Sequence, residues 1–251
     1  MLPPPAPGAG SYRYLLNGEP TAVHEDFVVP ADPSAPLHGE RRAPGGVVLR
    51  VEVTQGGPAD AGCVLHFRSD ALAGRGIAEV VAEYRLEGGR LEVTRTVGGN
   101  SSPLLVDTAG EGRTIGSDGR EIAGEGGDAG PDAVLSPLLR VFQGPAIAAC
   151  LASGGPRPVV VPDLDAPDDP TRLLAPTVQR RRAERRGVEM VATDGGAALW
   201  RHCRYVGGQY DDNADFWLDD RDRLVRYRFP QGPDRVWDVE LLEQPRHDDR
   251  P

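Results

Sequence analysis

Lysine is absent from this chain of 251 residues, and all 28 of its basic residues are arginine. A phosphate-binding loop of the Gly-x-x-x-x-Gly-Lys type is therefore excluded, because the lysine of that loop contacts the phosphates. Acidic residues number 38, so the formal net charge is −10. This charge argues against nucleic-acid binding, since most non-specific affinity for nucleic acids comes from neutralising phosphates.

Long apolar runs are also missing. The longest apolar stretch, residues 146–152, is far shorter than the ~20 residues that a membrane-spanning helix needs, so no membrane span is expected. The three cysteines, Cys63, Cys150 and Cys203, are odd in number and far apart, which argues against a disulfide framework and favours a reducing compartment. The proline-rich N-terminus has neither the basic nor the apolar region of a secretory signal, and we expect a cytoplasmic protein.

Alternation of apolar and polar side chains is the strongest signal that is present. Between Ala78 and Val97, apolar residues recur at every second position on both sides of Gly88-Gly89, the pattern of a half-buried β-hairpin with a two-residue turn. A turn of this length pairs Glu87 with Arg90, Leu86 with Leu91, Tyr84 with Val93 and Ala82 with Arg95. The apolar partners then share one face of the hairpin.

The last third of the chain predicts an antiparallel meander. Loops at residues 219–222 and 230–234 would place Phe216 opposite Val225, and Tyr227 opposite both Ala214 and Trp237. On the other face, Asp215, Arg226 and Asp238 would then form a ladder of alternating charge across three strands.

These patterns predict a mainly β fold: a single curved antiparallel sheet, an open barrel or roll of about ten strands, with a short broken helical insertion. Further strands are expected at residues 12–16, 21–29, 47–54, 64–68, 158–161, 187–193 and 197–206. The helix is expected within residues 132–153, where Asp132 can cap it and Gly144-Pro145 divides it into two pieces. Residues 30–46 and 109–130 are expected to be long loops. One domain, residues 11–243, would lie between a disordered leader, 1–10, and a disordered tail, 244–251.

Several short motifs resemble uncharacterised bacterial families with the lipoprotein-carrier-like fold. The closing hairpins of those families resemble Tyr205-x-Gly207-Gly208, Asp215-Phe216-Trp217-Leu218-Asp219 and Leu224-x-Arg226-Tyr227. Their opening hairpin resembles Asn17-Gly18-Glu19 with Glu25, and their helical plug resembles residues 138–145. The resemblance implies a spiral β-roll whose concave face holds helices and an apolar cavity, and it implies a carrier or binder of lipid-like ligands, glycolipids included.

Catalytic and metal-binding patterns are incomplete. A calcium-loop spacing begins at Asp211, but Phe216 stands where such loops need glycine, and Asp222 replaces their bidentate glutamate. His202 and Cys203 would point to opposite faces of a strand and could not readily share a zinc ion with the Cys63 and His66 pair. The serines lack the Gly-x-Ser-x-Gly pattern of a nucleophile. We expect no catalytic residues, no metal and no cofactor.

Arg95 is the most informative charged residue, because the hairpin register places it on the apolar face, where an arginine must be paired or reach a water-filled cavity. The run Arg180–Arg186 could be an anion or headgroup site, but we favour a solvated strand or turn face whose charge the nearby aspartates neutralise. We predict a soluble, non-enzymatic binding module for a lipid-like small molecule. Its ligand-binding residues would be Arg95, near an acidic headgroup, and an apolar wall of Tyr84, Val93, Phe216, Tyr227, Trp237 and Leu241. An interaction or scaffold protein plugged by its own helices is the alternative, followed by a hydrolase. The pattern predicts no oligomeric state.

Overall fold

The computed structural model describes residues 5–54, 62–87, 90–107, 114–115, 121–122, 133–193, 196–208, 210 and 214–243. Its strands belong to one sheet of 17 strands. They are β1 (Gly8–Leu16), β2 (Glu19–Val29), β3 (Leu37–Ala43), β4 (Val47–Thr54), β5 (Gly62–Arg68), β6 (Val80–Glu87), β7 (Arg90–Val97), β8 (Asn100–Asp107), β9 (Thr114–Ile115), β10 (Glu121–Ile122), β11 (Val134–Leu135), β12 (Arg157–Pro162), β13 (Pro176–Thr193), β14 (Gly196–Val206), β15 (Asp215–Leu218), β16 (Leu224–Pro230) and β17 (Val236–Glu243). The helices are α1 (Asp70–Ala73), the 3₁₀ turn η1 (Arg140–Phe142) and α2 (Gln143–Ser153).

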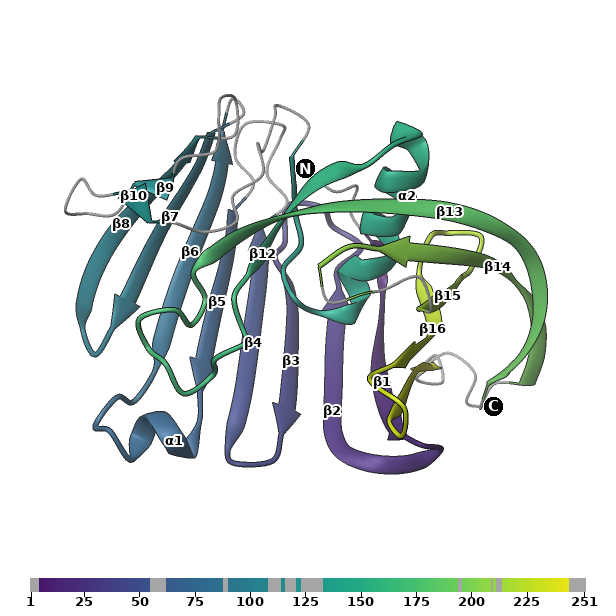
Figure 1. Cartoon of the computed structure of the whole chain (residues 1–251), viewed down its shortest axis with the longest axis horizontal. Helices are drawn as coiled ribbons and strands as arrows, with labels where there is room; N and C mark the ends of the chain where they lie inside the picture. Colours follow the sequence, from purple (N-terminus) through teal and green to yellow (C-terminus); the bar gives the residue numbers. More distant parts are fainter. Residues whose placement is uncertain are drawn as a thin grey trace.

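The sheet is two antiparallel meanders joined by the first strand. Strands β1 to β10 pair in chain order, as do β12 to β17, and β1 pairs with both β2 and β17. Among the described strands, the pairing of β11 with β12 is the parallel exception. The result is a strongly curved sheet, as Figure 1 shows, which confirms the expected mainly β, open antiparallel fold.

Local alternation explains why each strand has an inner and an outer face. In β4, Leu49 and Val51 are buried while Arg50 and Glu52 point outward. Strand β5 continues the inner face with Cys63, Leu65 and Phe67, which are all buried.

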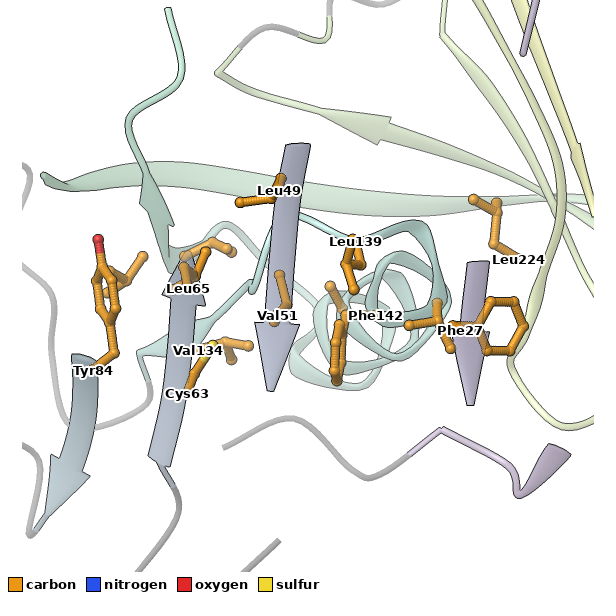
Figure 2. Packing of buried hydrophobic residues seen from close by; sticks show 14 of the residues in the cluster. Phe27, Leu49, Val51, Cys63, Leu65, Tyr84, Val134, Leu139, Phe142 and Leu224 are labelled. Carbon is orange, nitrogen blue, oxygen red and sulfur yellow. The ribbon is translucent and has the colours of Figure 1, made fainter. Parts of the chain in front are cut away.

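The segment from Ala133 to Ser153, here called the plug segment, fills much of the concave side. Helix α2 packs against β13 and lies between the wall of β2–β6 and the long strands β13 and β14 (Figure 1). Figure 2 shows Leu139 and Phe142 between Val51 and Phe27, which belong to that wall. Gly39 of β3 permits this approach, because a Cβ atom there would lie 2.3 Å from Cδ1 of Leu139.

The hairpin predicted between Ala78 and Val97 is confirmed, pair by pair. Strands β6 and β7 pair Glu87 with Arg90, Leu86 with Leu91, Tyr84 with Val93 and Ala82 with Arg95. The turn itself, Gly88-Gly89, lies outside the described residues.

The register predicted for the C-terminal meander is wrong by two residues. Phe216 pairs with Tyr227 rather than Val225, and Tyr227 pairs with Val239 rather than Trp237. The turn after Leu218 is one residue longer than expected, and an irregularity next to it adds a second residue. A shift of two keeps every side chain on its expected face, because strand side chains alternate with a period of two. The predicted ladder is therefore broken: Arg226 still reaches Asp238 at 2.7 Å, but Asp215 pairs with His202.

Other expectations fail where side-chain alternation is weak. The predicted loop 30–46 contains β3, and β8 and the first half of β13 were not expected, so the sheet has more than ten strands. Within the predicted helix, Val134 and Leu135 form β11, and the helix begins only beyond Leu139. Gly144-Pro145 lies in the first turn of α2 and does not divide it, because proline is tolerated where N–H groups have no helical partner. Asp132 and most of the loop 109–130 lie outside the described residues.

Strand β1 begins at Gly8, inside the predicted leader, whereas residues 1–4 and 244–251 are outside the described part of the chain. No helix in the described part has the length and apolar character needed to cross a membrane.

Candidate functional site

The buried carboxylate of Glu25 and the half-buried Arg140 meet where the plug segment enters the concave face. Leu138 has a φ of 68°, a backbone strain that turns the chain so that Arg140 points inward at the start of η1. Glu25 of β2 is 0% exposed. Its carboxylate accepts hydrogen bonds from the backbone N–H of Arg140 at 2.5 Å and from the Tyr14 hydroxyl at 2.9 Å. Burial raises the pKa of Glu25, and the nearby Arg41 and Arg140 oppose that rise.

The Arg140 guanidinium is held mainly by neutral groups. Its Nε donates to the Tyr14 hydroxyl at 3.2 Å, and its Nη1 donates to Gln143 Oε1 at 2.8 Å and to the Tyr210 hydroxyl at 3.0 Å. The guanidinium also lies 4.8 Å from the centre of the Tyr227 ring, within cation–π range. These contacts fix the side chain in position, and among the described residues no carboxylate bonds to its guanidinium.

Arg181 of β13, which is buried, is held in the same way. Its Nε donates to Gln179 Oε1 at 3.0 Å and its Nη1 to the Tyr205 hydroxyl at 3.3 Å. Its guanidinium stands over the rings of Tyr205 and Tyr210, 5.2 and 5.4 Å from their centres. Amide and aromatic groups again compensate the burial of the charge.

Arg140 and Arg181 line one cavity together with Arg41 of β3. We call this cavity, of about 420 Å³, the arginine cavity; Gln143, Gln179, Asp163 and Tyr210 are also among its lining residues. Asp163 is buried and bonded to Arg172, with Oδ2 2.9 Å from Nη2. Asp165, at the rim, is exposed. The arginines therefore outnumber the acidic groups that remain without a cationic partner in the lining.

A second cavity, of about 370 Å³, adjoins the first and has mostly apolar walls. It shares Arg41, Arg140 and Leu164 with the arginine cavity. We call it the apolar cavity; its walls include Tyr14, Val23, Leu49, Phe67, Tyr227, Phe229 and Trp237. Charged donors at one end and apolar walls at the other are the arrangement that suits an amphipathic molecule.

The predicted ligand-binding residues divide between the cavity and the core. Tyr227 and Trp237 line the apolar cavity. Tyr84, Val93 and Phe216 are 0% exposed and line neither cavity, and the Tyr84 hydroxyl donates to the Leu174 carbonyl at 2.6 Å. Leu241 is also buried. These side chains belong to the packed core and line neither cavity.

Arg95 lies on the apolar face, as its register predicts, and is 6% exposed. Its guanidinium donates to the carbonyls of Pro170 at 2.8 Å, Thr171 at 2.9 Å and Leu173 at 2.6 Å. Arg95 thus anchors the loop between β12 and β13, and it lines neither the arginine cavity nor the apolar cavity. Its expected role beside an acidic headgroup has no support in these contacts.

Sequence reasoning missed Arg41 and Arg140, and it considered Arg181 only as part of a run for which a solvated face was favoured over an anion site. Arg181 belongs to the run expected to be a solvated face, yet alternation along β13 buries it between the exposed Arg180 and Arg182. Arg140 stands alone among the apolar residues of the Leu138–Phe142 stretch. A single charge inside an apolar run is the signal of a buried polar contact. Arg41 follows polar residues and precedes Arg42, so no such signal distinguishes it in the sequence.

Comparison of the chain with protein-family models, with curated proteins and with solved structures returned no match.

Proposed function

We propose that this protein is a non-enzymatic binding module that holds an amphipathic, lipid-like molecule in the concave face of its sheet. The observation that carries the proposal is the apolar cavity, of about 370 Å³, that continues from a cavity lined by arginines. A ligand of this class would place its apolar part against Phe67, Phe229 and Trp237. The sequence resemblance to the lipoprotein-carrier-like families predicts the same class of ligand.

The competing function, a scaffold plugged by its own helices, is favoured by the plug segment, whose residues Phe142, Ile147 and Cys150 are buried in the core. A fully plugged roll would be close-packed, whereas a carrier keeps a void of several hundred cubic ångströms. The apolar cavity lies beside the plug segment and favours the carrier.

Native mass spectrometry of the purified protein, followed by titration with decanol, tests the proposal. We expect a co-purifying lipid or decanol binding that changes the fluorescence of Trp237, and we expect Trp237→Phe to remove that change. Ala43→Trp, which places a bulky ring in the wall of the apolar cavity, should abolish binding. Ala71→Trp is the matched control, because Ala71 is exposed on α1.

The absence of any co-purifying molecule together with no binding of decanol or of its acidic analogues would contradict the carrier and leave the scaffold. Equal binding by Ala43→Trp and the native protein would place the ligand elsewhere on the molecule.

A further inference from the structure

Arg41, Arg140 and Arg181 come from β3, η1 and β13, and the fold brings them to one cavity. Three guanidinium groups repel one another, so their convergence costs free energy unless anionic groups compensate it. Two buried carboxylates lie next to this group: Glu25, the cross-strand neighbour of Arg41, bonds to the backbone N–H of Arg140 rather than to a guanidinium, and Asp163 bonds to Arg172. The three arginines are therefore compensated only in part.

Hydrogen-bond donors of two of these arginines are left over. Arginine carries five N–H groups, and the bonds of Arg140 engage only Nε and Nη1. In the described part of the chain, no residue accepts a hydrogen bond from Nη2 of Arg140 or from the guanidinium of Arg41. Arg41 is half-buried and is one of the residues that line both cavities.

Unused arginine donors on fixed side chains match an oxyanion. The planar guanidinium forms paired hydrogen bonds with carboxylate and phosphate oxygens, which a neutral hydroxyl headgroup cannot reproduce. Gln143, Gln179 and the aromatic rings hold Arg140 and Arg181 in place before any ligand arrives, which lowers the entropy lost on binding.

We propose that the arginine cavity binds the acidic headgroup, a phosphate or carboxylate, of the molecule whose apolar part occupies the adjoining cavity, and that Arg41 is the residue that selects the acidic group. This inference rests on the proposed function. It adds the chemical class of the headgroup and the residues that recognise it.

Isothermal titration with four probes separates the two proposals. The probes are decyl phosphate, decanoate, decanol and inorganic phosphate. We expect the two acidic amphiphiles to bind at least about tenfold more tightly than decanol, and decyl phosphate to bind more tightly than inorganic phosphate. Raising the salt concentration should weaken the binding of the acidic probes and leave the affinity for decanol unchanged.

Arg41→Met keeps an apolar stem of similar length and removes the donors. We expect this variant to lower the affinity for decyl phosphate and decanoate by about thirtyfold or more, and to leave the affinity for decanol unchanged. Arg42→Met is the matched control: Arg42 is the next residue of β3, is exposed, and bonds to Glu40 instead. Arg41→Lys, which keeps the charge without the planar fork, should recover only part of the affinity. It also serves as the test if Arg41→Met does not fold.

Each result decides between the proposals. Equal affinities for decanol and decyl phosphate would overturn the acidic headgroup and leave the amphipathic carrier intact. Equal affinities for inorganic phosphate and decyl phosphate, with the binding of both abolished by Arg41→Met, would show that the site binds a free anion and would overturn the carrier. Binding of acidic amphiphiles that Arg41→Met and Arg42→Met reduce equally would overturn the role of Arg41. No binding of any probe would overturn both.

Discussion

The hydroxyl of Tyr14 joins the buried carboxylate of Glu25 to the half-buried guanidinium of Arg140, and its removal tests whether this network stabilises the fold. The hydroxyl donates to Glu25 at 2.9 Å and accepts from Nε of Arg140 at 3.2 Å. Tyr14→Phe deletes both bonds and leaves the Glu25 carboxylate and Nε of Arg140 without that partner. Hydrogen bonds to charged groups contribute about 1.5 to 3 kcal/mol each, and the second bond is long. We expect the free energy of unfolding to fall by about 2 to 4 kcal/mol.

Tyr12→Phe is the matched control, two residues earlier on the same face of β1. Tyr12 is 1% exposed and Tyr14 is 4% exposed, so the rings are equally buried. The Tyr12 hydroxyl makes one bond to a neutral group, the Leu224 carbonyl, at 2.9 Å. Its loss should lower the free energy of unfolding by about 1 kcal/mol.

Urea unfolding at neutral pH, followed by circular dichroism, measures both losses. A double-mutant cycle of Tyr14→Phe with Glu25→Gln should give a coupling energy of about 1 kcal/mol or more, because the two side chains are in contact. Equal losses for Tyr14→Phe and Tyr12→Phe, with no coupling to Glu25, would refute the idea that the hydroxyl links the two charged groups.

Three further outcomes follow from the same packing. Gly144→Ala would place a Cβ atom 2.0 Å from the Asp222 carbonyl oxygen, so urea unfolding should show a free energy of unfolding lower by about 1 to 3 kcal/mol. Gly155→Ala is the control and should be nearly neutral, because the space around Gly155 is open. Similar losses for the two variants would contradict the docking of α2. The folded state raises the pKa of Glu25 above the ordinary 4.5, so the stability that this group contributes is present in acid and lost as the pH rises through the folded pKa. The difference in the free energy of unfolding between the native protein and Glu25→Gln should therefore fall above pH 4.5, by at most about 1.4 kcal/mol per pH unit. A difference that rises with pH would show that the pKa of Glu25 is lowered instead. Burial raises the pKa of the Cys150 thiol to about 11, and Cys63 and Cys203 are also buried. A thiol reagent at neutral pH should therefore modify all three cysteines only as fast as the protein opens. Rapid modification without urea would contradict their burial.

The β6–β7 hairpin was predictable residue by residue, whereas the C-terminal meander was predictable only by face. Two adjacent glycines restrict the first turn to one short geometry, so the register follows from it. The turns after Leu218 and Pro230 contain residues compatible with several lengths, and an irregularity next to Leu218 adds another. A register error of two residues leaves each side chain on the same face of its strand, so Phe216 and Tyr227 face the expected side although their predicted partners were wrong.

The candidate site was less predictable than the fold. Arg95 was identified from its place on an apolar face, and burial of that side chain is confirmed, but carbonyl groups of a distant loop bind it. The loop between β12 and β13 carries no pattern that ties it to β7, so the sequence did not show which groups would meet Arg95. Tyr227 and Trp237 were chosen for the ligand wall on the same reasoning, and they line the apolar cavity.

By itself, the sequence determined most of the strands whose side chains alternate and which side of each is apolar, because alternation is written in neighbouring residues and needs no knowledge of distant ones. It did not determine β3, β8 or the first half of β13. Only the tertiary structure decided that Arg41, Arg140 and Arg181 line one cavity. Their convergence depends on the pairing of β1 with both meanders, on the turn at Leu138 and on the docking of α2 against β13. These are contacts between residues far apart in the chain, and no local pattern encodes the distance between their side chains.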